Sequence, residues 1–198
     1  MTFVLATANP GKIREMQEVL SGFDIELVTR EDLGITLDVD ETGSTFRENA
    51  LLKATAICEA SGLPAIADDS GLIVDALDGG PGVDTSDFGG AGLDCDQRCA
   101  FLLNKLRGVE QRSAKFVCTI VCLFPDGRVI TSEGECQGEI AVSPRGAEGF
   151  GYDPVFLAKG STKTMAELTP EDKHRISHRG KALRKFVQDL QSWERGAV

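Results

Sequence analysis

The sequence is organised around residues 65–75, which read Ala-Ile-Ala-Asp-Asp-Ser-Gly-Leu-Ile-Val-Asp. Small and branched apolar residues flank Asp68 and Asp69 on both sides, a pattern that predicts two strands joined by a turn at which Gly71 takes a positive φ. Two adjacent carboxylates repel each other unless a cation or a proton lies between them. The stretch therefore predicts a divalent metal site, with a solvated turn as the alternative.

An acidic turn at residues 38–43 supplies a third carboxylate, Glu41, for such a site. Mg²⁺ usually takes only one or two carboxylates and keeps water and phosphate oxygens as its other ligands. Glu41, Asp68 and Asp69 are thus the candidate Mg²⁺ ligands, and the remaining ligand positions suit a phosphate-containing substrate.

Composition and charge narrow the class of protein. The chain has 198 residues, of which 41% are apolar and 26% charged, as in one compact domain or one domain with two lobes. Its 21 basic and 31 acidic residues give a net charge of −10, which argues against nucleic acid or an anionic membrane as a partner. The sequence has no signal-peptide pattern and no apolar run near the roughly 18 residues of a membrane span, so we expect a cytoplasmic protein.

The cysteines argue against a structural zinc site. There are six cysteines and two histidines, and no two cysteines have the Cys-x-x-Cys spacing. Buried thiols are the expectation. Cys118 and Cys122 fit it well, because they alternate with Phe116, Ile120 and Phe124 on one face of a predicted strand.

A polar turn between a short apolar strand and an amphipathic helix is a candidate phosphate site. Free backbone N–H groups and the helix dipole favour an anion at a helix start, and Lys12 adds a positive charge. The turn lacks the Walker pattern, so a plain turn is the alternative. Its residues are Thr7, Ala8, Asn9, Pro10, Gly11 and Lys12.

A second helix is predicted from its two ends. Thr45 and Glu48 have the spacing of a capping box, and Gly62 is a natural stop. Lys53 lies beside the apolar stripe of this helix. It is either a solvated lysine or a side chain that reaches toward a ligand.

Three further segments complete the pattern. A glycine-rich loop over 78–92 is long enough to be functional, although flexible filler is the alternative. A helix over 96–106 and a hairpin over 115–136 follow, and Asp126-Gly127 is the hairpin turn.

Two later stretches carry candidate groups for binding a nucleobase. Phe150 and Tyr152 are flanked by glycines, so a planar ligand can approach the backbone and stack on an aromatic ring. Residues 173–181 concentrate positive charge and contain both histidines, His174 and His178, just before the last helix. A run of charge is usually a solvated face, but the histidines favour a ligand site here.

Together these groups are the parts needed to cleave a nucleoside triphosphate. A metal ion neutralises phosphate charge, lysines hold phosphate oxygens, and a carboxylate positions or deprotonates water. Residue types and spacing lead to this reaction class but not to a particular substrate.

Five motifs run in order across almost the whole chain. They are Thr7-x-Asn9-x-x-Lys12, Glu41-Thr42-Gly43-x-Thr45-Phe46-x-Glu48-Asn49-Ala50-x-x-Lys53-Ala54, Ala67-Asp68-Asp69-Ser70-Gly71-Leu72, Gly149-Phe150-Gly151-Tyr152-Asp153-Pro154-x-Phe156 and Ser177-His178-Arg179-Gly180-Lys181-Ala182. In this order they resemble the motifs of the Ham1/RdgB inosine triphosphate pyrophosphatase family.

The resemblance implies a fold, an activity and a cofactor. The fold would be α/β, with a long curved mixed central sheet flanked by helices, in a single domain over 1–198 whose two lobes enclose the active site in a cleft. The activity would be Mg²⁺-dependent hydrolysis of ITP, dITP and XTP to the monophosphate and pyrophosphate. The protein would be a homodimer that binds neither nucleic acid nor a membrane.

The resemblance also implies roles for individual residues. Asp69 and Lys12 would be catalytic, with Asp69 accepting the proton of the water that attacks the α-phosphorus, and Glu41, Asp68 and Asp69 would hold Mg²⁺. The substrate-binding residues would be Thr7, Ala8, Asn9, Pro10, Gly11, Lys12, Lys53 and Ser70 on the triphosphate side, and Phe150, Gly151, Tyr152, Asp153, Lys173, His178 and Arg179 in the base and sugar pocket.

The residues implied for the base pocket suit a 6-oxo purine. O6 of such a base is an acceptor that His178 or Arg179 can bond, whereas the amino group of adenine would present a donor to a donor. Buried donors left unpaired reject the wrong base.

Two positions depart from the family pattern. Residues 84–90 read Asp-Thr-Ser-Asp-Phe-Gly-Gly, with Asp87 where relatives usually carry arginine, and Cys99 stands where relatives often carry Asn. Two alternatives to this activity stay open, the first of them because of the charge reversal at Asp87. One is a nucleotide-binding protein of the same fold with reduced or altered turnover, and the other is a phosphomonoesterase that uses the same carboxylates.

Overall fold

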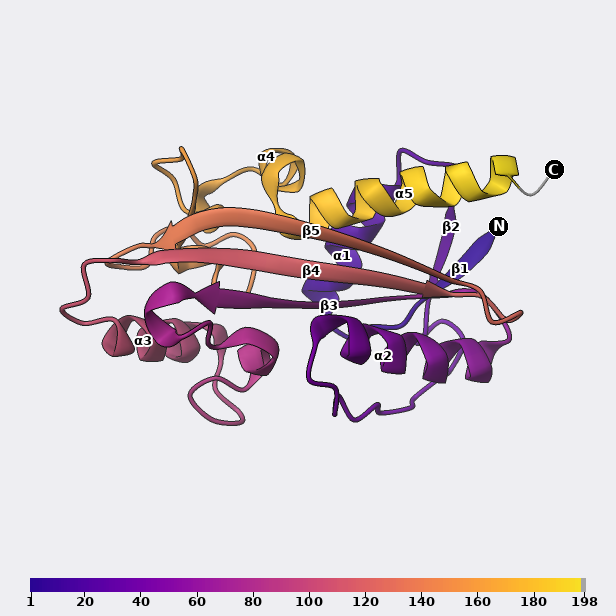
Figure 1. The fold of residues 1–198 in the computed structure, drawn as a ribbon, viewed down its shortest axis with the longest axis horizontal. Helices are drawn as coiled ribbons and strands as arrows, with labels where there is room; N and C mark the ends of the chain where they lie inside the picture. The colour runs from indigo at the N-terminus through magenta and orange to yellow at the C-terminus, as the bar shows by residue number, and fades with distance from the viewer. Residues whose placement is uncertain (197–198) are drawn as a thin grey trace. The chain divides into compact units, whose positions relative to one another are not determined.

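In a computed structural model, residues 1–196 of the chain form an α/β fold on a six-stranded sheet with the order β2-β1-β3-β4-β5-β6 (Figure 1). The strands are β1 (Thr2–Leu5), β2 (Glu26–Thr29), β3 (Ala65–Val74), β4 (Ser113–Leu123), β5 (Val129–Ile140) and β6 (Phe156–Ala158). The α-helices are α1 (Pro10–Leu20), α2 (Phe46–Ser61), α3 (Cys95–Lys105), α4 (Pro170–Ile176) and α5 (His178–Gly196). Short 3₁₀ helices lie at Asp75–Leu77, Gly82–Ser86, Asp153–Val155 and Met165–Glu167.

The sheet is mixed, which confirms the predicted fold class. β1 pairs in parallel with both β2 and β3, and Val4 lies opposite Ala65 in the second pairing. β5 pairs antiparallel with β6. β4 leads into β5 through the predicted turn, at which Gly127 has a φ of 85°.

A single ten-residue strand, β3, runs through the Asp68-Asp69 pair, so the predicted turn between two strands is wrong. Gly71 does not have the positive φ that such a turn requires. A strand covered on both faces is apolar on both sides of any polar pair, so the pattern does not distinguish one buried strand from two strands around a turn. The strand continues through both carboxylates because each meets a cation on its own face, as described below.

Local signals predicted the helix ends well. Thr45 and Glu48 make both bonds of the capping box at the start of α2, and Gly62 ends the helix with a φ of 68°. Asn9 caps α1 through its side chain, and Pro10 is the first residue of that helix. These signals succeed because a helix end depends on residues that are neighbours in the sequence.

The described chain divides into two compact units. Unit 1 contains residues 1–69 and 118–134 and the chain from Arg179 onward, and unit 2 contains residues 70–117 and 135–178. Each unit has its own apolar core.

Unit 1 has a core on each face of its strands, because successive residues of a strand point to opposite faces. Phe3 and Leu5 of β1 pack with apolar residues of α1 and α5, whereas Val4 and Ala6 pack with those of α2. Figure 1 shows α2 and α5 on opposite sides of these strands. The two faces of β3 in unit 1 therefore meet different helices.

Five of the six cysteines are buried, as predicted, and Cys118 and Cys122 belong to the same core as Phe3. Cys95 is the exception, because its side chain is exposed at the first residue of α3. No helix within the described residues is long and apolar enough to cross a membrane.

Candidate active site

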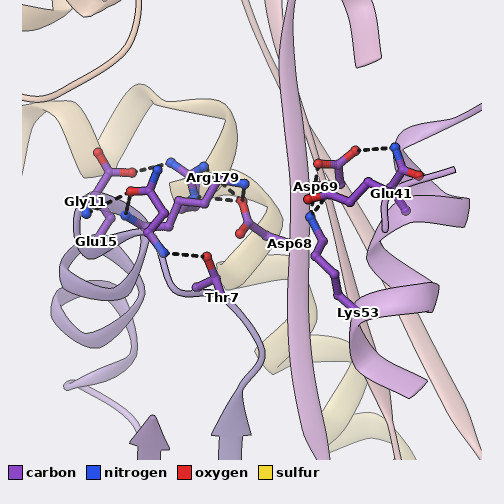
Figure 2. A network of polar contacts seen from close by, with 11 residues as sticks. Thr7, Gly11, Glu15, Glu41, Lys53, Asp68, Asp69 and Arg179 are labelled. Atoms are coloured by element: carbon purple, nitrogen blue, oxygen red, sulfur yellow. Dashed lines mark hydrogen bonds and ion pairs between the residues drawn. The ribbon is translucent and has the colours of Figure 1, made fainter. Parts of the chain in front are cut away.

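The two central carboxylates lie on opposite faces of β3. Figure 2 shows Asp68 on the side of Arg179 and Glu15, and Asp69 on the side of Lys53 and Glu41. This follows from the alternation of side chains along a strand. Asp68 and Asp69 thus belong to two separate charge clusters of unit 1.

The first cluster neutralises Asp68, whose side chain is fully buried. Its Oδ2 accepts hydrogen bonds from Nη2 and Nε of Arg179, at 2.9 and 3.2 Å, and lies 3.2 Å from Nζ of Lys12. The third guanidinium nitrogen of Arg179 donates to Oε2 of Glu15 at 2.5 Å. One buried arginine therefore ties β3, α1 and α5 together.

Charge explains why this buried cluster stays ionised. Burial alone would raise the pKa of Asp68, but the positive charges of Lys12, Arg179 and Lys53 outweigh burial and hold its pKa well below the usual range. Burial lowers the pKa of Arg179, yet Asp68 and Glu15 raise it further than burial lowers it. Asp68 is a carboxylate and Arg179 a guanidinium at any working pH.

The second cluster surrounds Asp69. Nζ of Lys53 donates to Oδ1 of Asp69 at 3.2 Å and to Oε2 of Glu41 at 2.8 Å, and the lysine is only 8% exposed. Nδ2 of Asn49 approaches Oδ2 of Asp69 at 3.4 Å, while Oδ1 of Asn49 accepts from the backbone N–H of Gly43 at 2.7 Å. Asp69 is held from both of its oxygens.

The electrostatic environment of Asp69 is opposite to that of Asp68. Burial raises its pKa, Lys53 and Lys12 lower it, and the neighbouring charges of Glu41 and Asp68 raise it, with a net increase. A carboxylate with a raised pKa is a better proton acceptor than an ordinary aspartate. Of the two aspartates, Asp69 is therefore the one suited to general-base chemistry.

The donor set around Asp69 fits a hard divalent cation. Oxygens of Glu41 and Asp69 converge on one positive charge, the ammonium of Lys53. Two carboxylates with water and phosphate oxygens are the usual surroundings of Mg²⁺. Within residues 1–196 no cluster of three or more potential ligand side chains is found, and Asp68 points to the other face of β3.

The predicted phosphate turn is the N-terminus of α1. The side chain of Asn9 accepts from the N–H groups of Gly11 and Lys12 at 2.9 and 3.1 Å, and Oγ1 of Thr7 accepts from N–H of Asn9 at 3.2 Å. Ala8 and Pro10 are exposed in the same turn. The turn is thus preorganised by its own side chains and presents Lys12 near Asp68.

Unit 2 holds the predicted base-binding loop in a tight conformation. Oδ2 of Asp153 accepts from N–H of Phe150 at 2.8 Å and from Nζ of Lys173 at 2.5 Å. The ammonium of Lys173 also lies 5.0 Å from the centre of the Phe150 ring. Gly149 is required, because a Cβ there would come within 2.2 Å of Oδ2 of Asp153.

The two aromatic rings of this loop have different surroundings. Tyr152 is buried in the core of unit 2, and its hydroxyl donates to the backbone carbonyl of Thr85 at 3.1 Å. Oγ1 of Thr85 in turn accepts from N–H of Leu72 on β3 at 2.9 Å. Phe150 is only partly buried, so its ring is the more exposed of the two.

The structure groups the predicted residues by unit. Unit 1 brings together Thr7, Ala8, Asn9, Pro10, Gly11, Lys12, Glu41, Lys53, Asp68, Asp69 and Arg179; unit 2 contains Ser70, Phe150, Gly151, Tyr152, Asp153, Lys173 and His178. Ser70 follows Asp69 on β3 and is partly buried. His178 is buried and its ring stacks on Phe116, with 4.7 Å between centres.

Sequence reasoning missed three residues that support these groups. Glu15 could have been found from its spacing, since it lies one helical turn after Lys12 on the same side of α1. Asn49 stood inside a quoted motif, but nothing in the sequence indicated that it bonds Asp69. Thr85 gave no signal, because its two partners are distant in the sequence.

The mixed sheet, the buried carboxylate–lysine cluster and the capped phosphate turn define an α/β protein equipped for phosphate chemistry. The chain belongs to the Ham1 family, whose model matches residues 3–189.

Proteins similar to this chain share nearly its whole length. A dITP/XTP pyrophosphatase of Deinococcus deserti is 50% identical over 91% of this chain and 85% of the relative. One of Aquifex aeolicus is 49% identical over 98% and 99% of the two chains.

Solved structures agree. A HAM1 protein from Coxiella burnetii matches with a TM-score of 0.87 and 40% identity over 97% of this chain and 99% of the other. The Ham1 protein of Staphylococcus aureus matches with a TM-score of 0.84 and 39% identity over 100% of both chains.

Proposed function

We propose that this protein hydrolyses non-standard purine nucleoside triphosphates, ITP, dITP and XTP, to the monophosphate and pyrophosphate, and so removes them from the nucleotide pool. The observation that carries the proposal is Asp69, a buried aspartate held by Lys53 and Asn49 next to a second carboxylate, Glu41. The curated relatives named dITP/XTP pyrophosphatase support the choice of substrate.

In the proposed hydrolysis at the α-phosphorus, Asp69 is the proton acceptor and pyrophosphate is the leaving group. Asp69 accepts a proton from water while the water oxygen bonds to the α-phosphorus, and the bond from that phosphorus to its bridging oxygen breaks, so that pyrophosphate leaves. In this proposal Lys12 and Lys53 bind phosphate oxygens and stabilise the charge that develops on them. Thr7, Asn9 and Gly11 shape the turn that presents Lys12.

We propose Mg²⁺ as the cofactor, held by Glu41 and Asp69, where Lys53 already provides a positive charge. When bound, the ion neutralises phosphate charge. Asp68, which the family resemblance also implies as a ligand, contacts Lys12 and Arg179 on the opposite face of β3. In this proposal Asp68 fixes the orientation of those two cations.

The base would be recognised by unit 2. Phe150 offers the more exposed aromatic ring, and Lys173 and His178 are candidate donors to a 6-oxo group. Arg179, which the resemblance assigns to the same pocket, directs its guanidinium to Asp68 and Glu15. We therefore propose that Arg179 contributes by holding the site rather than by reading the base.

The same resemblance leads us to propose a cytoplasmic homodimer. Light scattering on the purified protein tests the oligomer, and a mass equal to one chain would contradict it.

Product analysis tests the proposed reaction. The protein is incubated with Mg²⁺ and a panel of ITP, dITP, XTP, ATP and GTP, and nucleotide and phosphate products are separated. We expect IMP and pyrophosphate from ITP, with a kcat/KM well above that for ATP. Inorganic phosphate as the product would instead support a phosphomonoesterase, and tight ITP binding without product would support a nucleotide-binding protein with lost turnover.

A further inference from the structure

Two cysteines of α3 contact both backbone polar groups of one residue in the base-binding loop. N–H of Gly151 donates to Sγ of Cys95 at 3.3 Å, and Sγ of Cys99 donates to the carbonyl oxygen of Gly151 at 3.4 Å. Cys95 and Cys99 are four residues apart, so they lie on the same side of the helix. All of these contacts are within unit 2.

The backbone of Gly151 has a conformation that few residue types adopt. Its φ is 62°, in the left-handed region, and nothing lies within 4 Å of the position its Cβ would take. Its neighbours are fixed by other groups, Phe150 by Asp153 and Tyr152 by Thr85. The two thiols contact the residue that lies between Phe150 and Tyr152 in the chain, Gly151.

The two thiols have complementary roles. Cys99 is buried, and burial together with the nearby acidic groups raises its pKa to about 12, so it keeps its proton and can donate to a carbonyl. Cys95 is exposed at the start of α3 and acts as the acceptor. One donor and one acceptor match the carbonyl and the N–H of a single peptide residue.

We propose that Cys95 and Cys99 are positioning residues that hold Gly151, and with it Phe150, in the conformation that binds the purine. The inference rests on the proposed function, in which this loop contacts the base. Cys99, the second position that departs from the family pattern in the sequence, thereby contacts the loop backbone directly.

The test measures binding of ITP by calorimetry with Mg²⁺ omitted, so that ITP is not hydrolysed, for Cys95→Ala, Cys99→Ala and Cys99→Ser. Losing one hydrogen bond of about 1 kcal/mol should raise the Kd for ITP about fivefold in each Ala variant, and Cys99→Ser should recover part of the loss because it retains a donor. Where ITP is hydrolysed, KM should rise while kcat stays within about twofold. Cys122→Ala, which removes a buried thiol of unit 1, is the matched control and should bind ITP like wild type.

Inorganic tripolyphosphate separates positioning of the base from general damage, because it has no base. Its Kd should be the same in wild type and in both Ala variants. Unchanged ITP binding in both variants, or an equal loss for ITP and tripolyphosphate, would overturn the inference. Absence of pyrophosphate from wild type would contradict the proposed function alone, since the Kd ratios still decide the role of the cysteines.

Alkylation gives a second measurement on the native chain. Cys95 is the one exposed thiol among the described residues, so iodoacetamide should add a single group under native conditions, detectable by mass spectrometry. Alkylated protein should bind ITP as weakly as Cys95→Ala, and the variant itself should not be modified. Complete modification of Cys95 with an unchanged Kd for ITP would overturn its role.

Discussion

Asp69 and Asp68 are adjacent in the sequence, but their side chains lie in different electrostatic environments on opposite faces of β3 (Figure 2). Asp68 accepts from a buried guanidinium and is a fixed anion, whereas burial and the adjacent carboxylates raise the pKa of Asp69. One residue is thus a structural anion and the other a candidate base. The alternation of a strand is enough to separate the two roles.

Replacing Asp69 with Asn keeps the size of the side chain and removes the proton acceptor. We expect kcat for ITP to fall by about 10²–10⁴-fold, with the free energy of unfolding little changed. Steady-state kinetics and urea unfolding measure the two effects. Asp126→Asn, at the exposed hairpin turn, is the control, and an unchanged kcat in Asp69→Asn would remove this residue from the role of base.

Arg179 is the residue on which the first charge cluster depends. Arg179→Ala removes the guanidinium that bonds both Asp68 and Glu15 and leaves two buried carboxylates without it, so we expect the free energy of unfolding to fall by about 3–5 kcal/mol. Arg179→Lys keeps the charge but loses the two-pronged contact, and its loss should be smaller. A loss below about 1 kcal/mol in the Ala variant, as for an exposed ion pair, would show that the cluster contributes little to the stability of the fold.

At the scale of elements, the sequence predicted what is local and missed what is distant. The capping box of α2 and its glycine stop were read correctly because all the bonding groups lie within a few residues. The course of β3 was misread, because its cations come from other elements and Arg179 is 111 residues away from Asp68. The candidate site residues came from residue types and from motif resemblance, and neither could show their division between two units.

The loop around Gly149 and Gly151 offers a matched pair of substitutions. Both glycines have positive φ, 79° and 62°, so Ala costs about 1–2 kcal/mol of backbone strain at either position. At Gly149 the new Cβ would also clash with Asp153 and approach Nζ of Lys173 at 3.1 Å, whereas at Gly151 the space is open. Urea unfolding should therefore show a larger loss of stability for Gly149→Ala, and equal losses would contradict the described loop.

For the whole molecule, buried thiols cause the free energy of unfolding to fall at alkaline pH. Burial raises the pKa of Cys118 and of Cys99 from 9.0 to about 12. Above pH 9 the unfolded chain releases these protons while the folded chain keeps them, so this contribution to stability is complete below pH 9 and is lost as the pH rises toward 12.

Comparison of wild type with Cys118→Ala between pH 9 and 11 measures this effect. The free energy of unfolding should fall less steeply with pH in the variant than in wild type. The two slopes should differ by about 1.4 kcal/mol per pH unit, the effect of one thiol. Ile120→Ala on the same strand is the control, because it lowers stability but keeps every thiol. Its slope of unfolding free energy against pH should equal that of wild type. Equal slopes in Cys118→Ala and wild type would contradict burial of the thiol.

The proposed reaction depends on attack of water at the α-phosphorus of a purine nucleoside triphosphate. Hydrolysis of ITP in H₂¹⁸O with Mg²⁺, followed by mass spectrometry of both products, tests it most directly. We expect one ¹⁸O in IMP and none in pyrophosphate. Label in pyrophosphate, or in released inorganic phosphate, would place the attack at another phosphorus and contradict the proposed reaction.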